Sequence, residues 1–160
     1  MSNETPLLKV PADQYGPAYR DHVLEQYKLY VEMANEISER RVSTHNYFLT
    51  VNSGLVTLYG LVSAFHANAS RNWQYLIPAA GILVCVSWLV LIRSYRELNT
   101  AKFRVIHEIE QYLPVAGYER EWSFLERGRG TRYMPLTHVE PYIPWVFLGL
   151  YALLAVFGPK

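Results

Sequence analysis

Charged residues are absent from three long stretches of this 160-residue chain: 42–70, 72–92 and 141–159 contain no Asp, Glu, Lys or Arg. A helix needs about 20 mainly apolar residues to cross the roughly 30 Å hydrocarbon core of a bilayer. Each stretch has room for one such helix. Only 18% of the residues are charged, whereas soluble domains average about a quarter. The charge pattern therefore excludes an ordinary soluble globule and predicts three transmembrane helices.

These stretches predict an all-α, oligomeric protein whose first two transmembrane helices extend into a cytoplasmic helical hairpin. The first extension contains neither Gly nor Pro, so it can continue without a break into the first span. The second extension keeps a helical pattern until Pro114 ends it. The predicted segments are an N-terminal tail over 1–18, an amphipathic helix over 19–46, a first span over 47–67, an external link over 68–74, a second span over 75–92, a helical region over 93–141, a third span over 142–157 and a C-terminal tail over 158–160.

Basic residues are distributed unequally about the three spans. Of the 15 Lys and Arg residues, only Arg71 lies in the 68–74 link and only Lys160 lies in the C-terminal tail. Positive residues near the ends of spans stay on the cytoplasmic side. The distribution predicts a cytoplasmic N-terminus and a C-terminus on the far side of the membrane. Residues beside the spans are expected to contact lipid head groups: Arg40, Arg41, Arg93, Arg96, Trp73 and Tyr75.

Both helical extensions carry an apolar stripe at three- and four-residue spacing. A stripe of this kind has to be buried against another element. The two stripes pair with each other in one subunit, or pack against neighbouring subunits, and both arrangements are compatible with the pattern. The stripe residues are Val23, Tyr27, Ala34 and Ile37 on the first extension and Leu98, Val105 and Ile109 on the second.

The start of the third apolar segment carries two conflicting signals. Thr137 and Glu140 have the spacing of a capping box, which marks the first turn of a helix. Pro144 follows four residues later, and a proline in a helix interior removes a hydrogen bond and clashes with the preceding turn. We therefore expect the third helix to begin later than the capping box indicates, or to be kinked at Pro144. The alternative to a third span is a segment that lies flat on the membrane.

The first span is polar for a transmembrane helix. Small or weakly polar residues follow its length at alternating three- and four-residue spacing, so they share one face: Thr50, Ser53, Thr57, Gly60 and Ala64. Such residues let helices approach closely and hydrogen-bond across the contact. In a ring of subunits the same face can line a water-filled path instead. Asn52 lies off this face and needs its own partner, because an unsatisfied amide in hydrocarbon costs several kcal/mol.

Residues suited to catalysis or metal binding do not form a recognisable site. His107 and Glu108 begin a pattern like that of zinc proteases, but Gln111 stands where the second His is required. His107 and Glu110 share a helical face, where a solvated or inter-subunit pair is expected. Cys85 has no partner base and fits a packing role. With a net charge of +1, the chain also lacks the basic character of a nucleic-acid binder, so we predict no enzyme, no cofactor and no metal.

Three strings carry a resemblance to a known family: EQYKLYVEMANEISERR at 25–41, WLVLIRSYRELNTAKFRVIHEIEQYLPVAGYEREW at 88–122 and HVEPYIPWVF at 138–147. The chain resembles the RipA-like family of small octameric bacterial membrane proteins. The resemblance implies a bacterial inner-membrane protein that assembles as a homo-octamer. For some intracellular pathogens it also implies a role in growth within host cells. It implies no residue-level mechanism.

Two classes of function remain open from the sequence. The first is a homo-oligomeric assembly of unknown cargo, without catalytic activity, that serves as a scaffold or a pore-like element. The second is a membrane adaptor that binds a soluble cytoplasmic partner through Trp122 and a tyrosine-rich surface. A membrane-perforating defence effector is a further alternative by analogy of architecture alone.

The predicted orientation can be tested by cysteine labelling in a Cys85→Ala background. We expect a cysteine at Ala69 to react with an impermeant thiol reagent in intact spheroplasts, because the 68–74 link should be external. A cysteine at Ser123 should react only after lysis. Labelling of the Ser123 variant in intact spheroplasts would mean that the orientation is inverted.

Overall fold

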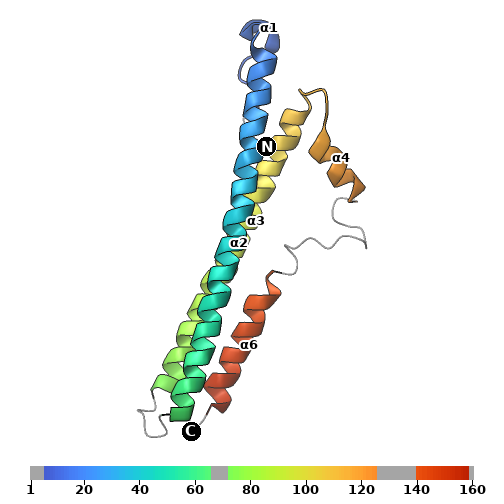
Figure 1. The fold of residues 1–160 in the computed structure, drawn as a ribbon. Coiled ribbons are helices and arrows are strands. Elements are labelled where there is room, and N and C mark those ends of the chain that lie inside the picture. The colour runs from blue at the N-terminus through green and yellow to red at the C-terminus, as the bar shows by residue number, and fades with distance from the viewer. Residues whose placement is uncertain (1–5, 66–71, 126–139, 159–160) are drawn as a thin grey trace. The chain divides into compact units, whose positions relative to one another are not determined.

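The computed structural model describes residues 6–65, 72–125 and 140–158, and most of these residues lie in helices (Figure 1). No strand occurs within these three ranges. The all-α prediction is therefore confirmed. The helices are α1 (Ala12–Tyr15), α2 (Tyr19–Phe65), α3 (Trp73–Glu110), α4 (Gly117–Phe124) and α6 (Tyr142–Phe157).

Two of these helices combine an amphipathic part and an apolar part without a break. Helix α2 has 47 residues and α3 has 38, and both are long and apolar enough to cross a membrane. Helix α6 is apolar but has only 16 residues. At 1.5 Å per residue it is about 24 Å long, shorter than the hydrocarbon core of a typical bilayer.

Helix α6 begins at Tyr142, later than a capping box at Thr137 and Glu140 indicates, as one of the two sequence-based expectations states. Its N-cap is Pro141, which makes no side-chain capping hydrogen bond. Pro144 is the third helical residue, and the amide groups of the first turn have no intrahelical partner in any case. The later start places Pro144 in the first turn, where the helix accommodates it. Of the proposed capping box, residues 137–139 lie outside the described part of the chain, and Glu140 forms an ion pair instead.

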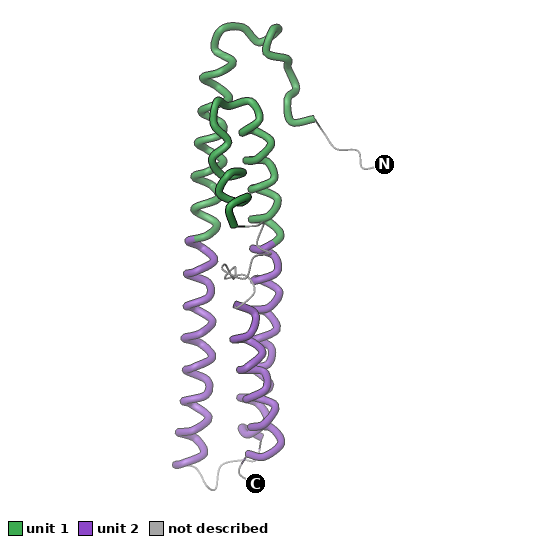
Figure 2. Tube along the Cα trace, turned by 90° about the vertical axis from the view of Figure 1, so that its right-hand side faces the viewer, with its two compact units in different colours: residues 1–38, 97–134 green, residues 39–96, 135–160 purple. Residues whose placement is uncertain are grey.

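The chain divides into two compact units (Figure 2). The hairpin unit comprises residues 1–38 and 97–134, and the three-helix unit comprises residues 39–96 and 135–160. Helices α2 and α3 each contribute one part to both units. Helix α4 belongs to the hairpin unit, whereas α6 belongs to the three-helix unit.

In the hairpin unit, the apolar stripes of α2 and α3 pair within one chain. Ala34 and Ile37 of α2 are buried, as are Ile106 and Ile109 of α3. Leu98 is exposed, so it does not belong to this contact and is left as a candidate for contact with a neighbour. Apolar residues lie on several adjacent sides of α3. The three- and four-residue spacing alone therefore did not identify Ile106 as a buried residue. The remaining stripe residues are half-buried: Val23, Tyr27 and Val105.

The described part of the N-terminal tail packs onto the first turn of α2. The Tyr15 hydroxyl lies 2.8 Å from His22 Nδ1, and the Tyr15 ring meets the rings of Tyr19 and His22 edge to face. Gly16 joins α1 to α2 with a φ of 96°, a left-handed conformation that glycine adopts without a steric penalty.

Aromatic rings form the core of the three-helix unit. The Phe48 ring of α2 stacks on the Trp88 ring of α3 at a centroid distance of 5.6 Å, and Phe147 of α6 packs against the same indole. Buried residues recur on α3 every three or four positions, the spacing that keeps one helix face against its partners. They are Gln74, Pro78, Gly81, Cys85, Trp88 and Ile92.

Gly81 sets how closely α6 approaches α3. A Cβ atom at this position would overlap the ring of Tyr151, which is completely buried. Glycine is therefore required here for space and not for its backbone freedom. By contrast, a Cβ atom at Gly149 on α6 would meet no atom within 4 Å.

We predict that Gly81→Ala loosens the three-helix unit, because overfilling a packed contact typically costs about 1–3 kcal/mol. Cys85 is the single cysteine of the chain and is buried, so its reaction with a thiol dye reports on opening of this core. Gly81→Ala should label faster and at a lower temperature than the native protein. Gly149→Ala is the matched control and should label at the native rate; equal rates for both variants would contradict the close approach.

Candidate functional site

The Asn52 side chain connects all three helices of the three-helix unit and is completely buried. Its Nδ2 donates a hydrogen bond to the Phe48 carbonyl at 2.8 Å. Its Oδ1 accepts a hydrogen bond from Cys85 Sγ of α3 at 3.1 Å and another from the Tyr151 hydroxyl of α6, also at 3.1 Å. The prediction that Asn52 needs a partner is therefore confirmed.

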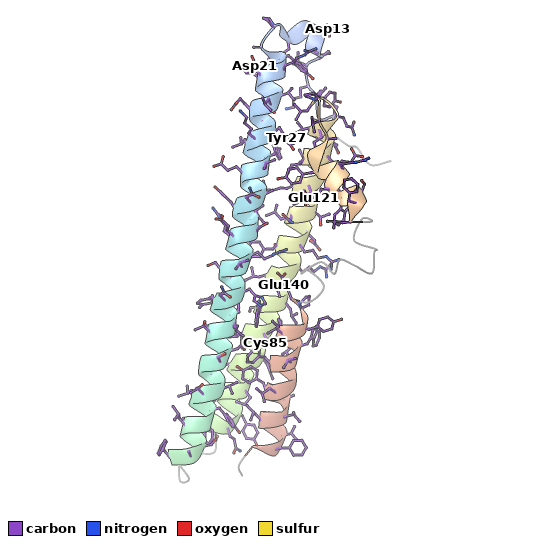
Figure 3. All side chains as sticks on the ribbon, turned by 45° about the vertical axis from the view of Figure 1, so that its right-hand side comes forward. Asp13, Asp21, Tyr27, Cys85, Glu121 and Glu140 are labelled. Carbon is purple, nitrogen blue, oxygen red and sulfur yellow. The ribbon has the colours of Figure 1, made fainter. Side chains whose placement is uncertain are left out.

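Cys85, which is labelled in Figure 3, serves as a hydrogen-bond donor inside this core. A reactive cysteine is normally a partly exposed thiolate next to a cationic group. The Cys85 thiol is buried, and the group that faces it is the neutral amide of Asn52. The geometry therefore supports a packing and hydrogen-bonding role for this residue.

Polar groups recur at seven-residue intervals on the inner face of α2. The His45 ring meets Trp88 of α3 edge to face at 4.9 Å, and Asn52 follows one heptad later. Tyr59 comes a further heptad along and donates a hydrogen bond to the Leu154 carbonyl of α6 at 3.2 Å. Each of these layers joins α2 to another helix, so together they define how the helices align along their axes.

An ion pair joins α2 to the residue that precedes the first turn of α6. Arg41 Nε lies 3.5 Å from Glu140 Oε1, and the two side chains are only 16% and 10% exposed. We expected Arg41 to contact lipid head groups, but its side chain lies largely inside the three-helix unit. The pair holds the start of α6 against α2.

The other residues expected at the head groups differ in their surroundings. Trp73 is half-buried, and its ring packs against Tyr59 at a centroid distance of 5.3 Å. The remaining four are exposed, as a contact with lipid requires: Arg40, Tyr75, Arg93 and Arg96.

A buried carboxylate organises the hairpin unit. Glu110, the last residue of α3, accepts a hydrogen bond from the Tyr27 hydroxyl of α2 at 3.0 Å. It also accepts bonds from the backbone amides of Tyr118 at 2.8 Å and Glu119 at 3.0 Å. These amides lie in the first turn of α4, where an anion satisfies unpaired donors and the helix dipole. Glu110 therefore caps α4 in place of a capping side chain from α4 itself.

Burial, together with the Glu110 hydrogen bond and the charge of the same carboxylate, raises the pKa of Tyr27 to about 12. The hydroxyl consequently keeps its proton and remains a donor. Between the unfolded pKa of 10.0 and the folded value, the unfolded chain binds fewer protons than the native chain. The stabilisation from this contact is thus complete below pH 10 and is lost as the pH rises toward 12.

We expected His107 and Glu110 to form a pair, but the hydrogen bonds of Glu110 go to other residues. The Glu110 carboxylate is directed to α2 and α4, while the His107 ring packs at 6.4 Å from Phe103. In the described ranges no group of three or more His, Cys, Asp and Glu side chains is placed to hold a metal ion.

The small residues of α2 form one continuous face, and all five are exposed: Thr50, Ser53, Thr57, Gly60 and Ala64. We call this the open face of α2. The Thr50 and Thr57 hydroxyls each donate to a carbonyl one turn earlier in α2, at 2.9 Å. A Cβ atom at Gly54 or Gly60 would meet no atom within 4 Å. The open face is therefore a shallow surface that no other described helix covers.

A model of the octameric membrane protein family (8xMP) matches residues 24–158. The chain belongs to this family. The match confirms the resemblance to small octameric membrane proteins, and it includes both units. No curated protein and no solved structure matches the chain.

Three contacts in this structure were not predicted from the sequence. The Glu110 cap and the Arg41–Glu140 pair join residues distant along the chain, so no local sequence pattern predicts them. Tyr151 did leave a signal, because a hydroxyl within an apolar helix needs a hydrogen-bond partner. Combined with Asn52, that requirement could have suggested the pairing.

We predict that Glu110→Gln releases the first turn of α4. Loss of a capping carboxylate costs about 1 kcal/mol, or roughly fivefold in the opening equilibrium. Hydrogen exchange measured by mass spectrometry should speed up in the peptide that covers α4. Glu108→Gln changes an exposed carboxylate on the same turn and should leave the exchange unchanged. If the two variants behave alike, the cap does not hold α4.

Proposed function

We propose that this chain is the subunit of a homo-octameric bacterial inner-membrane protein that crosses the membrane three times and acts as a scaffold without catalytic activity. The observation that carries this proposal is the open face of α2. Asn52, Cys85 and Tyr151 pair with one another inside the three-helix unit, whereas no described helix lies against this weakly polar face. Membership of an octameric family supports a second copy as its partner.

The chemistry of the open face favours close helix packing over a water-lined path. Thr50 and Thr57 donate their hydroxyl hydrogens within α2, so they present methyl groups outward. Gly54 and Gly60 leave room for a neighbouring backbone or a bulky side chain. Small residues of this kind permit close approach, which drives helix association in lipid.

The outer face of α6 has the opposite character and suits contact with lipid. Its exposed side chains are large and apolar, as expected for a surface among acyl chains. They include Trp145, Val146, Leu153 and Val156. A subunit with one small-residue face and one bulky apolar face is suited to a ring that packs protein inward and meets lipid outward.

Conduction by such a ring should be weak. The three charge-free stretches supply no Asp, Glu, Lys or Arg to a ring of charges within the membrane, and charged rings are a common basis of ion selectivity. We therefore expect a closed assembly in the resting state. A pore-like role remains the competing form of the same proposal.

The proposal predicts eight copies by native mass spectrometry in mild detergent. Ser53→Leu with Thr57→Leu should reduce or change that number, because bulky side chains overfill a close contact. Ala152→Leu adds the same bulk to the exposed side of α6 and should leave the octamer intact. Ion flux into liposomes, measured on the same samples, should be small for the native protein. An intact octamer whose large, selective current disappears in the double variant would make the protein a channel.

A membrane adaptor is the second candidate, and α4 provides the observation that favours it. None of the residues of this helix is buried, and Trp122 and Phe124 are exposed. Such aromatic residues suit a protein partner. A native monomer or dimer that retains a soluble partner, and loses it on Trp122→Ala, would favour the adaptor over the scaffold. A membrane-perforating defence role would instead appear as a large current from the native protein.

A further inference from the structure

We propose that the subunits join head to tail, with the outer ridge of α3 in one copy seated on the open face of α2 in the next. In this contact Leu83 lies against Ser53 and Gly54, and Leu76 lies against Gly60. The inference rests on the proposed octamer and adds which two surfaces build it.

The outer ridge of α3 is defined by three large residues at seven-residue spacing. Leu76, Leu83 and Val90 are 66%, 69% and 62% exposed. Small exposed residues, Ala80 and Ser87, lie between them. The open face of α2 has the same repeat, with small residues at Thr50, Thr57 and Ala64 and again at Ser53 and Gly60. Matching heptad repeats let knobs on one helix enter holes on another.

A closed ring requires two different surfaces on each subunit. In a cyclic assembly of eight copies, every contact is heterologous, so a surface meets a different surface of its neighbour. The open face of α2 therefore cannot pair with itself. Both α2 and α3 turn a face away from the core of the three-helix unit. Helix α2 leaves space at Gly54 and Gly60, whereas α3 exposes the large residues of its outer ridge.

Small residues on the open face of α2 lie at the same depth as large residues on the outer ridge of α3. In copies related by an axis normal to the membrane, a given residue lies at the same depth in every copy. The contacts within one copy therefore show which residues of α2 and α3 share a depth, and only such residues can meet between copies. Asn52 of α2 is level with Cys85 of α3, and the two helices run in opposite directions. Two residues beyond Asn52, Gly54 is then level with Leu83. Eight residues beyond Asn52, Gly60 lies within a helical turn of Leu76.

The same comparison of depths argues against α6 as the partner of the open face. Tyr151 is level with Asn52, and these two helices run in the same direction. Tyr59 bonds to the Leu154 carbonyl and α6 ends at Phe157, so Ala64 of the open face lies beyond the end of α6. Helix α3 begins at Trp73 and extends along the whole open face. Helix α3 is therefore the helix that can cover it, and the bulky side of α6 is left to the lipid.

Cysteine cross-linking in native membrane vesicles tests the contact directly. Cys85→Ser provides the background, because serine keeps a donor for Asn52 and does not react with maleimides. We expect Ser53→Cys combined with Leu83→Cys to give, with a short bismaleimide, a covalent ladder that extends to eight subunits. Neither single cysteine should give the ladder. Ser53→Cys with Leu153→Cys moves the second thiol to the outer side of α6 and serves as the matched control.

A pair of compensating substitutions, which enlarge one side chain and shorten the other, provides a second test that does not depend on cross-linking. Gly60→Leu should reduce the octamer in native mass spectra at least tenfold, because Leu76 of the next copy occupies that space. Gly60→Leu combined with Leu76→Ala should restore the octamer. The same Leu76→Ala change should not rescue Thr50→Leu, because Thr50 lies about three turns from Gly60 on the open face.

The outcomes separate this inference from the proposed function. A native octamer that gives a ladder with Leu153 instead of Leu83 would assign the contact to α6 and overturn the inference. Covalent dimers from Ser53→Cys alone would mean that α2 meets α2, which also overturns it. A native octamer with neither cross-linking nor rescue places the interface elsewhere. A native protein without any oligomer would refute the proposed octamer itself.

Discussion

One amide side chain, enclosed among three helices, is the constraint on which the three-helix unit depends. An unpaired amide in an apolar core costs several kcal/mol, so Asn52 has to find its partners inside the protein. Those partners come from α2, α3 and α6, through the Phe48 carbonyl, the Cys85 thiol and the Tyr151 hydroxyl. The three helices can satisfy it in one alignment along their axes, and Gly81 leaves the space that lets Tyr151 reach the site.

The hairpin unit also encloses a polar side chain that has to find its partners inside the protein, but here that side chain is a carboxylate. Glu110 is buried, yet three donors from α2 and α4 meet its carboxylate. A helix of eight residues is too short to be stable alone in water. Helix α4 therefore depends on this distant cap and on the ring contact between Phe103 and Tyr118. Within the described residues, Trp122 and Phe124 of this helix are exposed, as the adaptor hypothesis requires.

The hydrogen-bonded centre at Asn52 and the exposed outer faces together explain why this fold suits assembly. The inner polar layers hold one subunit in a defined arrangement, so its outer faces are preorganised before any neighbour arrives. One of these faces is shallow and another is ridged, at the same seven-residue repeat. In the proposed ring, this pair of faces supplies the two different surfaces that each subunit needs.

The sequence by itself determined the all-α class, the family, the residues of α6 at 142–157 and the need of Asn52 for a partner, since charge-free length, periodicity and a lone amide are local properties. Only the tertiary structure decided which donors meet Asn52, that Glu110 caps α4 and that Leu98 stays outside the hairpin contact. These outcomes depend on how far each helix is rotated and shifted against its neighbours. Periodicity predicts that a helix has an inner face, but contacts between distant residues set its rotation and level.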